Sequence, residues 1–372
     1  MGLALSTLGG WVVIVGCASV HLFRIWERRF SPHRRGLGLG LSASAVEAEA
    51  CNGAGAEAGP ASPDPPAPDP APFVRVAGLT DVTPAGAGLE FAVFRCRSPS
   101  GSGSLALRVP RYRTIANAND PHLDSRALLA QELAIYAHLS GSAVPVPTPR
   151  GLLEADDDAD DEAADVAMLA SFVESDGSRP SPRELGRVLG ALHALPPPAG
   201  FVPVVHEGGD ALETIATRLP RRWGELAALV PRLPRLPDTK ALLRHLSPLR
   251  RFPASLLHMD FRAANLLTGN GRIAGVVDWE NALLGPPAVE LCRLRETAHP
   301  GDGFEEGYAE TALEVPSLSP AEETVLRLDA AVMLARMQLQ MFLAASLGPV
   351  RRTKDKRLVP DLCPPPANPL SV

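Results

Sequence analysis

Alternation of apolar and polar residues, which is typical of strands, marks the first globular part of the chain. It occurs in three segments, with a Gly-Ala-Gly sequence between the first two. The segments are residues 73–85, 89–98 and 104–113. We therefore expect a β-sheet here, with a turn at Gly86 to Gly88.

Helical spacing replaces this alternation in residues 124–139, where apolar residues recur at intervals of three or four. Asp124 is a suitable N-cap, because its carboxylate can accept hydrogen bonds from the first backbone amides of a helix. Two further strands, 150–154 and 166–173, follow a proline-rich stretch. They predict a hairpin whose tip is a run of acidic residues, and such a run is usually a solvated loop.

Helical periodicity prevails from residue 174 to about residue 348. An amphipathic helix is expected at 182–195 and an arginine-rich helical stretch at 218–252. Residues 255–280 interrupt the helices with two short apolar strands around a polar loop and then a third strand. The chain thus predicts an α+β fold with two lobes, a small β-rich one over residues 73–173 and a larger helical one over 174–349.

The start of the chain has a different pattern. Residues 3–23 carry no charge and form a segment long enough to cross a hydrocarbon core. Five arginines follow within residues 24–35. This flank would leave the remaining chain in the cytoplasm. We expect residues 1–36 to be a membrane anchor; a peripheral helix, an import signal or a wrongly assigned gene start are the alternatives, and the protein would then be soluble and cytoplasmic.

Two further segments predict no regular structure. Residues 37–72 are rich in Pro, Ala and Gly, with seven prolines from Pro60 to Pro72, and they predict an extended linker. Residues 350–372 combine prolines with charges and predict a disordered tail.

Composition narrows the classes of function. The formal net charge is −6, and eight carboxylates lie within residues 154–165, so the rest of the chain is close to neutral. This balance disfavours a nucleic-acid binder. The five cysteines are scattered without a C-x-x-C pair, which disfavours a structural zinc site or a disulfide framework and fits a reducing compartment. Nothing in the sequence indicates the oligomeric state.

Lysine is scarce. The three lysines are Lys240, Lys354 and Lys356, whereas the other 33 basic residues are arginines. Any chemistry that needs a basic side chain on the predicted sheet must therefore use arginine.

The polar loop in residues 255–280 carries the candidate chemistry. It contains His258, Asp260 and Asn265 in the spacing H-x-D-x-x-x-x-N, and Asp278 follows at the end of the next strand. Phosphoryl transfer needs one carboxylate to orient a hydroxyl and take its proton, and an amide with a second carboxylate to hold Mg²⁺. Arg262 could offset charge on the transferred group.

Each of these residues also has a simpler interpretation. An isolated D-x-x-x-x-N is common, His258 could be only a hydrogen-bonding support, and Asp278 alone could cap a strand end. The four together, between apolar strands, favour the phosphoryl-transfer interpretation.

The segments HMDFRAAN and VVDWE resemble the catalytic loop and the metal-binding segment of the aminoglycoside phosphotransferase and choline kinase-like family, small-molecule relatives of protein kinases. The resemblance covers roughly residues 73–348 and is greatest with fungal-type members of unassigned substrate. It implies a bilobal protein kinase-like fold and Mg²⁺-dependent transfer of the γ-phosphoryl group of ATP or GTP to a small-molecule hydroxyl.

The resemblance also implies roles for individual residues. Asp260 would be the catalytic base, with His258 bracing its loop, and Asn265 and Asp278 would bind Mg²⁺. Two further residues would serve the nucleotide: Arg108 as the base that clamps its phosphates and Glu132 as the partner of that base.

The sequence departs from the family at three places. Arg108 stands where the kinase relatives have a lysine, and a guanidinium is a planar fork rather than a compact ammonium group. Gly86 and Gly88 could admit phosphates to the backbone or could form only a hairpin turn. Glu290 occupies a position at which relatives commonly have Asp, and we expect it to be structural. A pseudokinase, which binds nucleotide or metabolite without turnover, is therefore the alternative function.

The acceptor is only weakly indicated. The arginine-rich segment 218–252 favours a neutral or anionic acceptor over a polycationic one, although Asp302, Glu305, Glu306 and Glu310 could face the same cleft. Alternatively, both sets could be solvated surfaces.

Overall fold

The computed structural model describes residues 68–347 except 89, 102, 116–122, 156–164, 230–232 and 234. The expected membrane anchor, most of the linker and the C-terminal tail lie outside these residues. Within the described part of the chain, no helix combines the length and the apolar character needed to cross a membrane.

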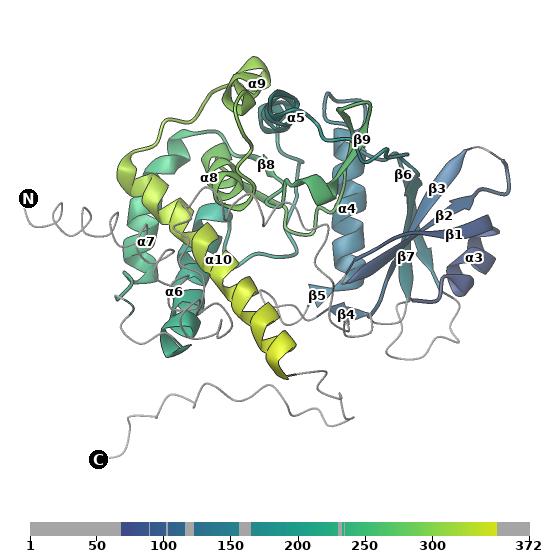
Figure 1. Ribbon diagram of the computed structural model, residues 1–372, viewed down its shortest axis with the longest axis horizontal. Coiled ribbons are helices and arrows are strands. Elements are labelled where there is room, and N and C mark those ends of the chain that lie inside the picture. The colour runs from purple at the N-terminus through teal and green to yellow at the C-terminus, as the bar shows by residue number, and fades with distance from the viewer. Residues whose placement is uncertain are drawn as a thin grey trace, which may run out of the picture.

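An antiparallel five-stranded sheet forms the first lobe, in the order β1-β2-β3-β7-β6 (Figure 1). Its strands are β1 (Thr80–Ala87), β2 (Phe91–Arg97), β3 (Ser104–Pro110), β6 (Pro149–Glu154) and β7 (Val166–Ser171). Leu105, Leu107 and Val109 alternate along β3 and pack in one core, so Arg108 points to the opposite face. The expected β-rich lobe and the hairpin of β6 and β7 are confirmed.

The prediction of a strand from residue 73 is wrong at its start. Residues 71–77 form a helix, α3 (Ala71–Ala77), that buries Phe73 against the sheet. Pro72 lies in its first turn, where no amide donor is required, and Gly78 ends it in the left-handed conformation with φ 59°. The pattern of apolar residues alone does not distinguish a helix this short from an alternating strand.

The ends of two strands also differ from the expectation. β1 continues through Gly86 and Ala87, and the turn begins at Gly88, whose amide donates to the Phe91 carbonyl (2.8 Å). Gly86 is therefore a strand residue rather than part of the turn. β3 ends at Pro110, three residues earlier than expected.

Helix α4 (Ser125–Leu139) covers the face of the sheet onto which Arg108 points, where it packs against β6 and β7 (Figure 1). Asp124 caps it as expected, because its side chain accepts a hydrogen bond from the Arg126 amide (2.9 Å). A two-stranded ladder of β4 (Thr114–Ile115) and β5 (Leu123–Asp124) precedes the helix.

The second lobe is helical, as expected. Its helices are α5 (Pro182–Ala194), α6 (Ala211–Leu229), α7 (Thr239–Leu246), α8 (Pro287–Thr297), α9 (Phe304–Thr311) and α10 (Pro320–Leu347), with a 3₁₀ turn, η2 (Ser247–Arg251), after α7. Helices α5 and α9 approach closely because Gly186 and Gly307 lie between them; a Cβ on Gly307 would be 2.0 Å from the Arg183 carbonyl oxygen. Helices α6, α7, α8 and α10 enclose a separate core.

Two small antiparallel ladders join the lobes. They pair β8 (Ser255–Leu257) with β11 (Leu283–Gly285), and β9 (Leu266–Gly269) with β10 (Arg272–Val276). The strand β11 was not expected, and the two strands that flank the polar loop belong to different ladders. The loop between β8 and β9, which includes η3 (Ala263–Asn265), and the segment between β10 and β11 are thereby brought side by side.

Candidate active site

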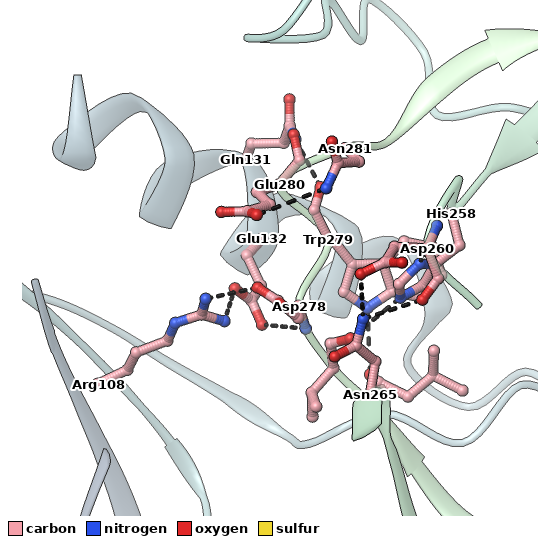
Figure 2. A network of polar contacts seen from close by, with 12 residues as sticks. Arg108, Gln131, Glu132, His258, Asp260, Asn265, Asp278, Trp279, Glu280 and Asn281 are labelled. Carbon is pink, nitrogen blue, oxygen red and sulfur yellow. Dashed lines mark hydrogen bonds and ion pairs between the residues drawn. The ribbon is translucent and has the colours of Figure 1, made fainter. Parts of the chain in front are cut away.

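Asp260 lies on the loop between β8 and β9, with its carboxylate fixed by two neighbours. The Asn265 amide nitrogen donates to both the carbonyl oxygen and Oδ2 of Asp260, each at 2.9 Å (Figure 2). Arg262 Nε also donates to Oδ2, at 2.9 Å. Because all three hydrogen bonds use the carbonyl oxygen or Oδ2, they leave Oδ1 uncommitted.

His258 links this loop to the next one. Its Nδ1 accepts from the Asp260 amide (3.2 Å), so Nε2 carries the hydrogen that is donated to the Val277 carbonyl (3.0 Å). The imidazole also packs against the Trp279 ring, with centroids 4.5 Å apart. The expectation that His258 supports the loop agrees with these contacts.

Glu290 of α8 holds the backbone of the same loop. Its two carboxylate oxygens accept hydrogen bonds from the amides of His258 (2.9 Å) and Met259 (2.7 Å), and His193 donates to it at 3.0 Å. Burial favours a raised pKa, but the hydrogen bond from His193 and those from the backbone lower the pKa of Glu290. Met259 has a positive φ of 64°, so this brace holds a conformation that is unfavourable for a side chain of its size.

Asp278 lies two residues after the end of β10, beside Asn265. The Val277 amide donates to the Asn265 carbonyl (3.0 Å), which ties the two segments together. Asp278 has a φ of 69°. Its amide donates to Glu132 Oε1 at 3.1 Å, so a residue of α4 fixes this turn.

Arg108 joins β3 to both acidic partners. Its guanidinium contacts Glu132 at 2.5 Å and Asp278 at 2.6 Å, and lies over the Phe91 ring at 4.2 Å (Figure 2). Burial opposes the charged form, but the two carboxylates raise the pKa of Arg108 above its ordinary value. Arg108 in turn lowers the pKa of Asp278 against the effect of burial.

Three further residues of this network were not identified from the sequence. Tyr136 donates to Glu132 from one helical turn along α4, a spacing visible in the sequence. The Gln131 amide donates to the Trp279 carbonyl (2.7 Å). Burial, followed by the charge of Asp278 and a hydrogen bond with Glu90, raises the pKa of Glu280 to about 9.

Gly86 and Gly88 lie at the β1–β2 turn, and their contacts give no reason for glycine. A Cβ on Gly86 would meet no atom within 4 Å, and one on Gly88 would meet only the Phe91 carbonyl oxygen, at 3.6 Å. Whether phosphates approach this turn stays a prediction.

The donor set at this site fits Mg²⁺. Over the described residues, no group of three or more His, Cys, Asp and Glu side chains is arranged to hold a metal. Mg²⁺ does not need such a group, because it is commonly bound by one or two protein oxygens together with phosphate oxygens and water. The hydrogen bonds of the Asn265 amide to Asp260 use Nδ2, so its oxygen remains for a cation beside the Asp278 carboxylate.

The charged residues considered for an acceptor pocket fall into two groups. Glu305 pairs with Arg295 (2.7 Å) and Glu310 with Arg183, so these two acids are engaged within the helical lobe. Arg250 pairs with the partly buried Asp210, and Arg251 pairs with the buried Glu322. Arg218 and Arg222, however, are buried, so a solvated surface is the wrong interpretation for these two.

Comparison with known proteins identifies the family of this chain. Residues 81–326 match the model of the phosphotransferase enzyme family, and no curated protein matches the chain. A macrolide 2'-phosphotransferase from Brachybacterium faecium is a similar solved structure, at 20% identity and TM-score 0.46, covering 73% of this chain and 92% of that one.

Two other similar structures are more distant. A thermostable mutant of the aminoglycoside phosphotransferase APH(4)-Ia, in complex with AMP-PNP and hygromycin B, has 18% identity and TM-score 0.44 over 74% of this chain and 97% of that one. A choline/ethanolamine kinase family protein from Mesorhizobium loti has 18% identity and TM-score 0.41 over 72% and 81%. Because the family model matches residues 81–326, which include most of both lobes and the segment 255–280, this chain belongs to the phosphotransferase enzyme family.

Proposed function

We propose that this protein transfers the γ-phosphoryl group of ATP or GTP to a hydroxyl group of a small molecule, with Mg²⁺ as cofactor. The observation that carries the proposal is the convergence of Asp260, Asn265 and Asp278 on two adjoining loops, opposite the pair formed by Arg108 and Glu132 (Figure 2).

Asp260 acts as the base. Arg262 and Asn265 hold Oδ2, so Oδ1 is the oxygen that accepts the proton of the acceptor hydroxyl. His258 and Glu290 keep the loop in place through its backbone. Arg262 can also offset the negative charge of the group in transfer.

The remaining residues serve the nucleotide and the cation. Asn265 and Asp278 hold Mg²⁺, which supplies positive charge beside the phosphates when it is bound. Arg108, oriented by Glu132, contacts the phosphates, and they are covered by Gly86 near the end of β1 and by the turn that begins at Gly88.

Substitution of the base is the direct test. Asp260→Asn should lower the rate of transfer by about 10²- to 10⁴-fold while nucleotide affinity stays near that of the wild type, because the base acts on the acceptor. Asp302→Asn, on an exposed acid outside the network, is the matched control. Loss of nucleotide binding in Asp260→Asn would mean that Asp260 supports the fold instead.

A pseudokinase is the second candidate, favoured by arginine at position 108 and by a glycine turn that no contact constrains. Thermal unfolding with Mg·ATP, with Mg·GTP and with nucleotide but no metal separates the two. A metal-dependent rise in the melting temperature together with slow nucleotide hydrolysis supports the enzyme. A rise in the melting temperature without nucleotide hydrolysis supports the pseudokinase. The absence of both the rise and hydrolysis contradicts the enzyme and the pseudokinase alike.

A further inference from the structure

A second cluster of charges lies inside the helical lobe, between α6, α8 and α10. It consists of Arg218 and Arg222 on α6, Arg293 on α8 and Asp329 on α10. We call these residues the arginine cluster. Three guanidinium groups therefore share one carboxylate in the interior of the lobe.

The carboxylate is taken up by a single arginine. Arg218 donates to both oxygens of Asp329, from Nε at 3.0 Å and from Nη2 at 2.5 Å. The nearest approach of Arg222 to Asp329 is 3.9 Å, from Nη1. The side chain of Arg222 is only 4% exposed, and its Nε and Nη1 have no hydrogen-bond partner among the described residues.

Burying a charged donor without an acceptor costs stability. Burial, and next the charge of Arg218, lowers the pKa of Arg222 to about 9. The same two causes lower the pKa of Arg293. A packed lobe has no structural need for such a group, since an apolar side chain of similar volume would fill the space at lower cost.

The arginine cluster surrounds a small cavity that borders the candidate active site. The cavity has a volume of about 10 Å³, and Arg218, Arg222, Arg293, Met259 and Asn281 line it together with two apolar residues. Met259 immediately precedes Asp260, and Asn281 follows Asp278 by three residues. The Asp260 carboxylate also acts electrostatically on Arg293, which places the cavity close to the base.

We propose that the arginine cluster binds the anionic group, a carboxylate or a phosphate, of the acceptor whose hydroxyl Asp260 deprotonates. The assignment as an acceptor site rests on the proposed function. Guanidinium groups match the planar or tetrahedral oxygens of both anions. The cavity accommodates an oxygen of the anion, while the rest of the acceptor extends toward Asp260. A polycationic acceptor would be repelled.

Direct anion binding is the first test. Inorganic phosphate and acetate are titrated separately into the full-length protein at constant ionic strength, with the melting temperature and calorimetric heat as readouts. We compare the wild type with Arg222→Met and with Arg221→Met, a control on the exposed neighbour that pairs with Glu207. The wild type and Arg221→Met should bind at least one of the anions saturably, and Arg222→Met at least tenfold more weakly.

The stability of Arg222→Met without anion is the second readout. Because the substitution removes a buried unpaired charge, its melting temperature should be equal to or above that of the wild type. A lower melting temperature, or anion binding equal to that of the wild type, overturns the proposal. Arg293→Met, on the partly exposed wall of the cavity, provides an independent variant that should also weaken anion binding.

The role in acceptor binding is tested with Mg·ATP and three acceptor classes: glycerate and glycerol phosphate as the two anions, glycerol as the neutral analogue, and hygromycin B as the cation. Transfer to an anionic acceptor should be at least tenfold lower in kcat/KM for Arg222→Met, mainly through KM. Equal transfer to the anionic acceptors by wild type and Arg222→Met, or transfer to glycerol or hygromycin B alone, overturns the inference but not the proposed function. Saturable anion binding without any nucleotide binding overturns the proposed function and retains the anion site.

Discussion

Two buried arginine centres in this molecule differ in charge balance. Arg108 lies between Glu132 and Asp278, which supply two carboxylates for one guanidinium. Arg222 lies beside Arg218, and the two share Asp329. The pKa of Arg108 is accordingly raised, whereas the pKa of Arg222 is lowered to about 9.

The comparison distinguishes two kinds of charge network. In a closed network the protein's own carboxylates balance the guanidinium charge, and in an open network they do not. At Arg108 the protein itself supplies the counter-charge, so the contacts can hold β3, α4 and the turn at Asp278 in one arrangement. At Arg222 the ion pair found among the described residues is the 3.9 Å approach to the shared Asp329, so we expect a bound anion to supply further counter-charge. Substitutions at the two centres should therefore have opposite effects on stability.

The largest effect is expected for Arg108→Met. The substitution leaves Glu132, which is 3% exposed, and Asp278 without their cationic partner. The free energy of unfolding should fall by about 3–5 kcal/mol, the cost of breaking a buried ion pair on one side. Denaturant unfolding measures it, with Arg97→Met on the exposed pair with Asp81 as the control. A change below about 1 kcal/mol would remove the contrast between the centres.

Asp329→Asn should have the next largest effect. It removes the carboxylate to which Arg218 donates two hydrogen bonds, while the amide retains part of the hydrogen bonding. We expect a loss of about 2–3 kcal/mol in the free energy of unfolding. Added phosphate should recover more stability in this variant than in Glu225→Gln, which alters the ion pairs of Glu225 with Arg221 and Arg336 on the same helices. Equal recovery in both would contradict an open network.

Tyr136→Phe tests whether Tyr136 and Arg108 act together on the Glu132 carboxylate. The hydroxyl donates to Glu132, which still keeps Arg108 and the Asp278 amide as partners. The loss should be about 1 kcal/mol. In a double-mutant cycle with Arg108→Met the two losses should not add, because both residues act on the Glu132 carboxylate. Additive losses would show that the contacts are independent.

The smallest effect is expected at a reference pair on the rim of the helical lobe, formed by the exposed Arg251 and the buried Glu322. The Arg251 hydrogen bond lowers the pKa of Glu322 to about 2. A carboxyl with a depressed pKa stabilises the fold above its unfolded pKa and loses this contribution as the pH falls. Between about pH 5 and pH 2, the wild type should therefore lose slightly more stability than Glu322→Gln, by about 1 kcal/mol or less. Parallel acid titrations of both would contradict this contribution.

Local patterns in the sequence predicted most of the architecture. The alternation of β3, the Asp124 cap of α4 and the change to helical periodicity after the sheet each depend on neighbouring residues. The exception is α3, where Phe73 and the residues after it satisfy both a strand pattern and one face of a short helix. Only the tertiary contact of Phe73 with the sheet distinguishes the two.

The candidate site divides in the same way. Asp260 and Asn265 were identified because their spacing within one loop carries the chemistry. The contact between Arg108 and Glu132 required the family resemblance. Glu290 was expected to be structural, but its hydrogen bonds to two consecutive amides of the loop could not be inferred from a position 31 and 32 residues further along the chain.

The arginine cluster was beyond sequence reasoning for a related physical reason. Arg218 and Asp329 are separated by 111 residues, and only the packing of α6 against α10 brings them together. The sequence indicates that segment 218–252 is basic, but it does not distinguish Arg222, which is buried, from Arg221, which is exposed.

The brace formed by Glu290 has a geometric consequence. Glu290 fixes the loop that carries Asp260, and Arg293 follows it by less than one turn of the same helix, α8. Helix α8 therefore positions both the loop that carries the base and one wall of the cavity. The distance between the Asp260 loop and the cavity wall at Arg293 is therefore fixed by the geometry of α8. We expect this protein to select acceptors by the distance between their anionic group and the hydroxyl that is phosphorylated.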